Sequence, residues 1–272
     1  MICETIDIRV EGVQEQAALH TYILNAAPNF ASNERPLILV CPGGGYGHVS
    51  DREGEIIAMQ FCAMGYHAAV LKYSVAPARF PTACLQVGKA VLELRKRAKE
   101  WHIIPDKIAV IGFSAGGHLA ASYSVFWNRG WMAEALGTDA AELKPNGLIL
   151  GYPVITSGEY AHQGSFLALL GDRYEELKEE LSLENQVSAA VPETFLWHTF
   201  EDSLVPVQNS MLFAQALAKN GISVEYHVFA KGGHGLSLAN EVTRSASGFG
   251  VEPTCQCWIE LLGRWLNDWK QK

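Results

Sequence analysis

The chain has 272 residues, of which 49% are hydrophobic and 18% are charged, and its formal net charge is -8. This composition supplies a large core and excludes an intrinsically disordered chain, while the net charge disfavours nucleic acid, an anionic polymer, as a partner. We therefore expect a globular, soluble protein that folds as one domain over residues 1–272.

The N-terminal segment MICETIDIRVEG has no basic start followed by an apolar run of signal-peptide length. No later stretch approaches the roughly 18 apolar residues of a membrane span. We therefore expect a cytoplasmic protein that has no membrane partner.

Short β-branched runs alternate with longer amphipathic stretches along the whole chain, which is typical of strands joined by crossover helices. Strands are expected at Thr5–Val10, Ala17–Leu24, Leu37–Cys41, His67–Tyr73, Lys107–Gly112, Gly147–Gly151, Thr194–Thr199 and Ser223–Phe229. Helices are expected at Glu53–Met64, Thr82–Trp101, Ala115–Phe126, Val207–Asn220 and Cys255–Lys270. The predicted fold class is α/β, with a mostly parallel eight-stranded central sheet and helices on both faces.

The region 152–191 interrupts this alternation. It starts with a segment that contains Pro and Gly and continues into RYEELKEELSLE, whose Glu and Lys spacing suits a solvated helix. We interpret it as an insertion or cap over the functional site.

The last predicted helix carries one apolar stripe. Its large side chains recur at i, i+4, i+7 and i+11, at Trp258, Leu262, Trp265 and Trp269. This spacing favours core packing over a binding face.

The six cysteines are scattered, and most lie in apolar segments where a free thiol packs as a small hydrophobic group. Cys255 and Cys257 form a C-x-C pair without a second cluster of Cys or His. The sequence therefore predicts reduced cysteines and no metal site.

The strongest local signal is IAVIGFSAGGHLAAS, in which an apolar strand leads through a G-x-S-x-G motif into the small residues that begin a helix. A nucleophile elbow requires this context, and its tight turn needs small residues at Gly112 and Gly116. Ser114 is the candidate nucleophile, and the Ala115 N–H at the helix N-terminus is a candidate oxyanion donor. The alternative is a glycine-rich strand-to-helix turn without catalysis.

Three consecutive glycines at positions 43–45 follow an apolar strand in PLILVCPGGGYGHVS. A loop without side chains can present backbone N–H groups to an oxyanion, and we expect Gly44 and Gly45 to be the donors. A nucleotide-phosphate loop is the alternative. It is disfavoured because GGGYG has neither the G-x-G-x-x-G spacing nor the Lys-Ser/Thr ending of a P-loop.

A serine hydroxyl needs a base to take its proton. His234 is the last of nine histidines and is flanked by glycines just after a β-like run, which suits an exposed loop. Between the serine and this histidine, TFLWHTFEDSLVPVQNS offers Asp202 next to Glu201. Asp202 is favoured because it is shorter and leads into the next helix, and the resulting order is serine, acid, histidine.

The remaining candidates surround this predicted triad. His118 and His198 are expected to be packed, hydrogen-bonded groups. The expected residues of the substrate pocket are Tyr46, His48, Tyr152 and His162.

With these motifs in order, the chain resembles the esterase branch of the α/β-hydrolase superfamily, particularly bacterial acetyl esterases that act on acetylated sugars and xylo-oligosaccharides. The likeness runs from about Leu37 to Trp265 and rests on PGGGYGHVSDREG, KYSVAPARFP, GFSAGGHLAAS, GYPVITSGEYAHQGSFLALLG, PETFLWHTFEDSLVPVQNS and KGGHGLSLA. It implies deacetylation of a carbohydrate ester by Ser114, Asp202 and His234. One departure is Gln86, where related chains commonly have Asp.

These observations predict a two-step acyl transfer without a cofactor, acting on a small-molecule ester such as an acetylated sugar. A peptidase or lipase-like hydrolase with the same triad is an alternative. A catalytically silent member of the fold that binds a small ligand is another. Assembly into a homo-oligomer is left open by the sequence.

Overall fold

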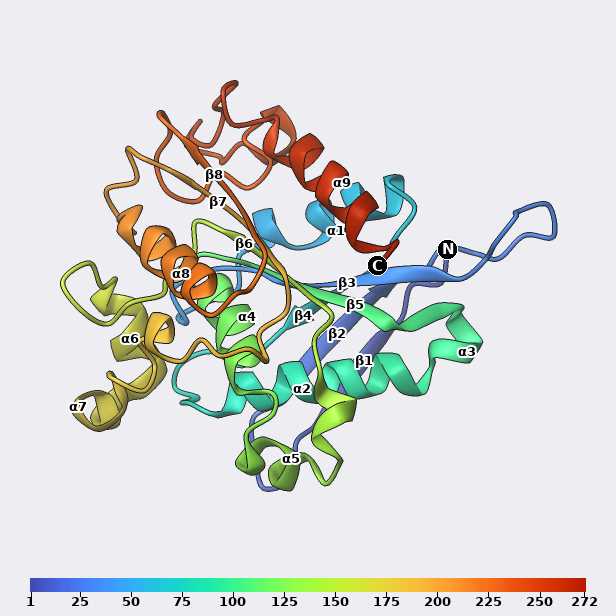
Figure 1. Ribbon diagram of the computed structural model, residues 1–272, viewed down its shortest axis with the longest axis horizontal. Coiled ribbons are helices and arrows are strands. Elements are labelled where there is room, and N and C mark those ends of the chain that lie inside the picture. Colours follow the sequence, from blue (N-terminus) through green and yellow to red (C-terminus); the bar gives the residue numbers. More distant parts are fainter.

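The computed structural model describes residues 1–272 and contains one eight-stranded sheet in the order β1-β2-β4-β3-β5-β6-β7-β8 (Figure 1). The pairs β1–β2 and β2–β4 are antiparallel, and every pair from β4 onward is parallel. The expected mostly parallel eight-stranded sheet is confirmed. The strands are β1 Thr5–Ile8, β2 Ala17–Tyr22, β3 Arg35–Cys41, β4 His67–Lys72, β5 Ile103–Phe113, β6 Gly147–Gly151, β7 Thr194–Thr199 and β8 Val224–Phe229.

Nine α-helices accompany the sheet: α1 Glu55–Ala63, α2 Thr82–Lys96, α3 Ala98–Trp101, α4 Ala115–Phe126, α5 Gly130–Leu136, α6 Gln163–Leu170, α7 Tyr174–Leu177, α8 Gln208–Lys219 and α9 Trp258–Trp269. All five predicted helices are present, but the one expected over Thr82–Trp101 is divided into α2 and α3 at Arg97. The sequence did not predict α5 or α6. No helix combines the length and the apolar character needed to cross a bilayer.

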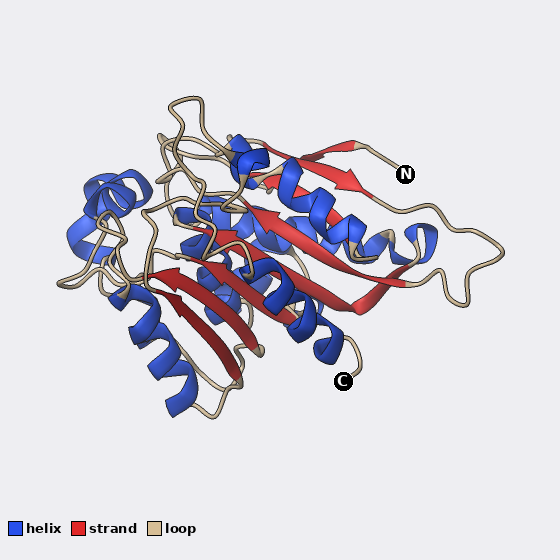
Figure 2. Cartoon of the chain, turned by 90° about the horizontal axis from the view of Figure 1, so that it is seen from above, coloured by secondary structure: helices blue, strands red, loops and turns tan.

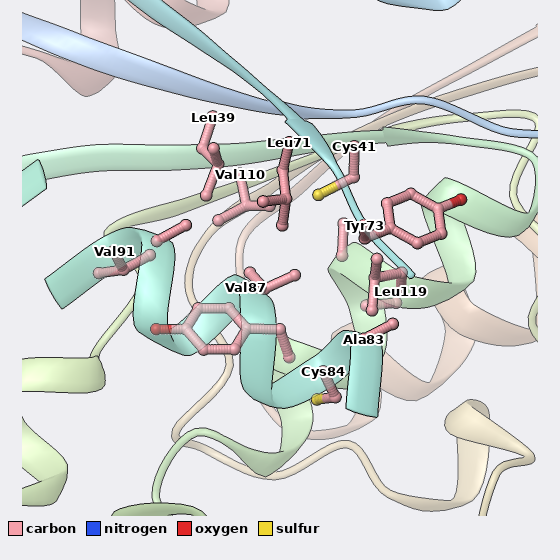
Figure 3. Packing of buried hydrophobic residues seen from close by; sticks show 14 of the residues in the cluster. Leu39, Cys41, Leu71, Tyr73, Ala83, Cys84, Val87, Val91, Val110 and Leu119 are labelled. Atoms are coloured by element: carbon pink, nitrogen blue, oxygen red, sulfur yellow. The ribbon is translucent and has the colours of Figure 1, made fainter. Parts of the chain in front are cut away.

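The helices form a layer on each face of the sheet (Figure 2). One core cluster joins the sheet to buried residues of α2, α4 and α8, and the other joins it to α1 and α9. Figure 3 shows Val87 and Val91 of α2 packed against the sheet. The strands between the layers are nearly continuous in apolar residues because both of their faces are buried.

The stripe on α9 is core packing, as predicted. All four of its large side chains are buried, and the Trp258 ring stacks on Trp197 of β7 at a centroid distance of 5.1 Å. On the opposite face, α8 ends at Lys219, and Gly221 just beyond it adopts a φ of +71°, a backbone conformation that favours glycine.

The prediction of a solvated helix over RYEELKEELSLE is wrong, because only Tyr174–Leu177 is α-helical there, with short 3-10 turns at either end of the segment. Leu177, Leu181 and Leu183 are all buried in the larger core cluster. At 100° per residue, Leu183 would point away from the other two on a continuous helix, so the chain must turn to bury all three. The Ser182 hydroxyl receives the Ser157 N–H at 2.9 Å in that turn.

The departure at Gln86 has a structural account. This side chain is buried on α2, where its carbonyl oxygen accepts the Ser74 N–H at 2.8 Å. Its amide nitrogen donates to the Ser74 hydroxyl at 2.7 Å and to the Glu15 carbonyl at 3.3 Å. The carboxamide therefore both accepts and donates, whereas an ionised aspartate could only accept.

All six cysteines are free, and four of them are buried.

Candidate active site

The segments that carry the predicted functional residues all follow the carboxyl ends of parallel strands. The glycine loop follows β3, Ser114 follows β5, Asp202 follows β7 and the His234 loop follows β8. Because parallel strands end at the same edge of the sheet, residues distant in sequence meet there. The same strands end on the side of the molecule where α6 and α7 lie (Figures 1 and 2).

Ser114 occupies a strained turn between β5 and α4, with φ 53° and ψ −122°. For a non-glycine residue this conformation costs of order 1–3 kcal/mol and must be imposed by the surroundings. A side chain at Gly112 would overlap the Gly116 carbonyl, and one at Gly116 would overlap the carbonyl of Cys41. The two glycines of the motif are therefore required by close backbone approach.

The structure brings Ser114, His234 and Asp202 together from three loops. His234 Nε2 lies 2.7 Å from Ser114 Oγ, and His234 Nδ1 lies 2.6 Å from Asp202 Oδ2. Since the carboxylate can only accept, Nδ1–H donates to it, and Nε2 is left to accept the serine proton. This arrangement can raise the nucleophilicity of a serine hydroxyl.

The Asp202 carboxylate is fully buried and has four hydrogen-bond donors. Oδ1 accepts the backbone N–H groups of Leu204 at 3.0 Å and Val205 at 2.9 Å. Oδ2 accepts from His234 and, at 3.1 Å, from His198 Nε2. Burial by itself raises the pKa of Asp202, but the hydrogen bonds from the two histidines outweigh it and hold the pKa well below its ordinary value. Asp202 is therefore ionised beside His234.

His198 is packed and hydrogen-bonded, as expected. Its Nδ1 lies 2.7 Å from the Ser210 hydroxyl, and its Nε2 faces both Asp202 and the Val205 carbonyl, at 3.0 Å from the latter. Burial lowers the pKa of His198, so the ring is neutral and donates from Nε2. The sequence does not reveal that the partner of His198 is Asp202, the predicted acid. The only signal in the sequence was that His198 and Asp202 are four residues apart, on either side of the turn that follows β7.

The N–H groups of Gly44, Gly45 and Ala115 donate to no acceptor within the chain. Gly44 and Gly45 have φ values of +126° and +63°, a backbone region that favours glycine. The Gly43 N–H is different because it donates to Glu53 Oε2 at 2.8 Å. Three free donors therefore lie in the segments next to Ser114, and the first glycine of the loop is not one of them.

A cleft of about 310 Å³ opens beside these groups. Leu204 is the only hydrophobic residue in its wall, which consists of Gly44, Gly45, His48, Ser50, Arg52, Glu53, Ser114, His162, Leu204, His234 and Gly235. A larger hollow of about 410 Å³ lies beside β2 and β4 and shares only Ser50 with the cleft. The larger hollow contains none of the predicted triad, whereas Ser114 and His234 line the smaller cleft. No group of three or more His, Cys, Asp or Glu side chains is placed to hold a metal ion.

Two of the four expected pocket residues, His48 and His162, lie in the cleft wall. Burial, together with the nearby His234, lowers the pKa of His162. Its Nδ1 lies 2.8 Å from the Ser165 hydroxyl at the start of α6, so the segment before α6 reaches the cleft.

The expectation that Tyr46 and Tyr152 line the pocket is wrong, because both are buried below its wall. Each has a positive φ, 58° and 38°, at the point where the chain turns back from the edge of the sheet. The Tyr46 hydroxyl lies 3.0 Å from His118 Nδ1, and the Tyr152 ring packs edge-on against His234 at 5.2 Å. His118 is packed as predicted, and burial lowers its pKa to about 4.

Comparisons with known proteins agree with this architecture. The BD-FAE family model matches residues 26–217. Endo-1,4-beta-xylanase B of Butyrivibrio fibrisolvens is 40% identical over 76% of this chain, and an acetylxylan esterase of Xylanibacter ruminicola is 30% identical over 74%. The chain spans only 33% and 41% of the lengths of these two relatives.

Solved structures resemble the chain over nearly its whole length. An acetyl ester-xyloside bifunctional hydrolase from Caldicellulosiruptor lactoaceticus has a TM-score of 0.82 and 34% identity, covering 97% of this chain and 96% of that chain. A carboxylesterase from Lactobacillus plantarum WCFS1 has a TM-score of 0.86 and 28% identity, covering 98% of each chain. An alpha/beta hydrolase enzyme from a Medee basin deep-sea metagenome library has a TM-score of 0.77 and 34% identity, covering 99% of each chain.

Proposed function

The chain belongs to the BD-FAE family and has the α/β-hydrolase fold, and from this premise we propose that it is a serine esterase that removes acetyl groups from xylose-containing carbohydrates. The observation that carries the proposal is the continuous hydrogen-bonded line from Ser114 through His234 to Asp202, with distances of 2.7 and 2.6 Å. In this proposal Ser114 is the nucleophile, His234 the general base and Asp202 the orienting acid.

In the first step, Ser114 Oγ forms a bond to the ester carbonyl carbon while its proton passes to His234 Nε2. The carbonyl oxygen becomes an oxyanion that accepts hydrogen bonds from the free N–H groups of Gly44, Gly45 and Ala115. The bond to the leaving alcohol then breaks, and the histidine gives its proton to that alcohol. An acetyl-serine ester remains.

In the second step, water attacks the acetyl-serine carbonyl while its proton passes to His234. The same backbone donors stabilise the second oxyanion, and the bond to Ser114 Oγ breaks as the serine regains its proton. Acetate leaves and the starting state returns. Ionised Asp202 stabilises the imidazolium in both steps and holds the Nδ1–H tautomer.

The nature of the cleft supports a sugar as the alcohol part of the substrate. Its wall offers imidazole, hydroxyl and backbone groups that can pair with sugar hydroxyls, whereas a long acyl chain would need apolar surface that Leu204 alone provides. The printed names of an acetylxylan esterase and an acetyl ester-xyloside hydrolase among the relatives support the same choice. Action on acetylated xylo-oligosaccharides is therefore the specific form of the proposal.

A substrate panel tests the proposal. Purified protein is assayed on p-nitrophenyl acetate, p-nitrophenyl palmitate, an aminoacyl p-nitroanilide and acetylated xylo-oligosaccharides. Preference for the acetyl esters is expected, whereas preference for palmitate or the anilide would favour the lipase-like or peptidase alternative.

A matched pair of serine variants tests the nucleophile. Ser114→Ala is expected to abolish turnover and labelling by a fluorophosphonate probe. Ser124→Ala is the control, because Ser124 lies on α4, is buried, and has a hydroxyl without a hydrogen-bond partner. Absence of labelling in the wild-type protein would favour a catalytically silent binder. A cytoplasmic location and a cap role for residues 152–191 stay predictions, and assembly into a homo-oligomer stays open.

A further inference from the structure

Glu53 is a buried carboxylate for which the two-step hydrolysis has no use. It ends the short 3-10 turn Asp51–Glu53 in the segment DREG, between the glycine loop and α1, and is only 4% exposed. A carboxylate withdrawn from water is costly unless donors satisfy its oxygens. The hydrogen-bond donors to the Glu53 carboxylate should therefore show which segments this residue connects.

Each oxygen of Glu53 has a different donor from a different part of the site. Oε2 accepts the Gly43 N–H at 2.8 Å, and Oε1 accepts the Tyr152 hydroxyl at 2.6 Å. The Tyr152 oxygen in turn accepts the Ser237 N–H at 2.9 Å. One carboxylate thus joins the glycine loop, at its first residue, to the segment that carries His234.

Tyr152 also touches the histidine directly. Its ring meets the His234 ring edge-on at 5.2 Å and is itself held by Trp197, whose ring centroid lies 5.0 Å away. Burial, with the neighbouring Glu53 carboxylate, raises the pKa of Tyr152 well above its ordinary value. The hydroxyl therefore keeps the proton that it donates to Glu53.

Arg52, the residue before Glu53, makes further hydrogen bonds between the turn Asp51–Glu53 and the segment that carries His234. Its Nη1 donates to the Gly235 carbonyl at 3.0 Å, and its Nε donates to the Thr243 carbonyl at 2.6 Å. Its own carbonyl accepts the Ser237 hydroxyl at 2.6 Å. The turn Asp51–Glu53 therefore contacts both loops whose relative position the chemistry depends on.

We propose that Glu53 is a positioning residue that holds the oxyanion loop and the histidine loop at one spacing, acting through Gly43 on one side and Tyr152 on the other. A run of three glycines has much backbone freedom, so the direction of its N–H groups must be set by a contact outside the run. Glu53 supplies that contact and places the donors relative to the base. The inference rests on the proposed esterase function.

The test is a double-mutant cycle on p-nitrophenyl acetate. Glu53→Gln keeps the shape but presents an N–H group to one of the two donors, and Tyr152→Phe removes the hydroxyl that links Glu53 to Ser237. Because misplacement by about 1 Å can cost about a hundredfold in rate, we expect each variant to lower kcat about 10- to 100-fold with little change in KM. The double variant should be no slower than the slower single variant, since both changes break one link.

Two controls separate positioning from general stability. Asp51→Asn alters an exposed carboxylate on the same turn, 3.7 Å from Lys72 Nζ, and should keep the wild-type kcat. Val91→Ala lowers stability at a buried position of α2 that is not part of the cleft wall, and it should also keep the wild-type kcat. A wild-type kcat in Glu53→Gln, strict additivity in the double variant, or an equal loss of kcat in Val91→Ala would overturn the proposal.

Hydrogen exchange provides a readout that does not depend on turnover. Peptides covering residues 43–50 and 232–238 should exchange faster in Glu53→Gln than in wild type, and at the wild-type rate in Ser114→Ala. Unchanged exchange in Glu53→Gln would overturn the positioning role even if the wild-type protein hydrolyses no ester. Inactivity of the wild type with faster exchange in the variant would instead refute only the proposed function.

Discussion

The acid loop, Thr199–Val205, and the histidine loop, Lys231–Leu236, hold their functional side chains in different ways. Three of the four donors to Asp202 come from residues within four positions of it, namely His198 at the end of β7 and Leu204 and Val205 in the acid loop. In the histidine loop, His234 is flanked by glycines, and its ring contacts Ser114, Tyr152 and Asp202, all distant in sequence. The Asp202 side chain is fully buried, whereas that of His234 is 12% exposed.

Asp202 is thus placed mainly by its own turn, whereas His234 is placed by distant parts of the fold. A conservative change at the acid should therefore alter the chemistry and leave the geometry intact. A change in the contacts of the histidine loop should alter the geometry and leave the chemical groups intact. The variants below test this distinction.

The largest effect is expected for Asp202→Asn. The amide keeps the shape of the side chain but removes the negative charge that stabilises the imidazolium and selects the tautomer of His234. The value of kcat on p-nitrophenyl acetate should fall by about four orders of magnitude. The melting temperature and circular dichroism spectrum should show a retained fold, and a kcat within tenfold of wild type would contradict the role assigned to the acid.

A smaller loss is expected for Arg52→Lys, which keeps the charge but cannot donate to both Gly235 and Thr243 with the geometry of a guanidinium. The histidine loop should shift, and kcat should fall about thirtyfold because the base is misplaced. Arg244→Lys is the matched control, since that side chain is half exposed and pairs with Glu241 outside the cleft. Equal rates in the two variants would show that the loop does not need its distant contact.

His198→Phe should have a milder effect on the rate. The ring keeps much of the volume but removes one hydrogen bond to Asp202, while the two backbone donors and His234 remain. We expect kcat to fall about fivefold. This loss is smaller than losing a full charge-assisted hydrogen bond, worth roughly 1.5–3 kcal/mol, would cause, because the local turn still holds the carboxylate. A loss as large as that of Asp202→Asn would refute placement by the turn.

The smallest effect on activity is expected for His118→Gln, which changes the dependence of stability on pH. Burial lowers the pKa of His118 to about 4, while the unfolded chain binds this proton near pH 6.5. The unfolded state therefore holds more protons between these values, and stability is lost as the pH falls through this range. Urea unfolding should show wild type losing about 2 kcal/mol more than the variant between pH 7 and pH 5, with kcat at pH 7 nearly equal. Equal losses in the two proteins would contradict a buried neutral imidazole.

The sequence alone was sufficient to predict the eight strands, the turn at Ser114 and the order of the candidate triad. These features depend on neighbouring residues: strand and helix periodicity is visible in a short window, and Gly112 and Gly116 are required by the turn in which they stand. The position of Asp202 also depends on neighbouring residues, because the end of β7 and the turn after it supply three of its four hydrogen bonds.

The tertiary structure alone decided which side chains meet. The inward turn of Tyr46 and Tyr152, the pairing of His198 with Asp202, and the short α7 in a segment patterned for a long helix all arise from packing between distant segments. The buried position of Glu53 belongs with them, because Gly43, Tyr152 and Ser237 come from three different loops. Residue spacing specifies a face of an element, but a hydrogen bond between two elements depends on how the whole chain brings them together.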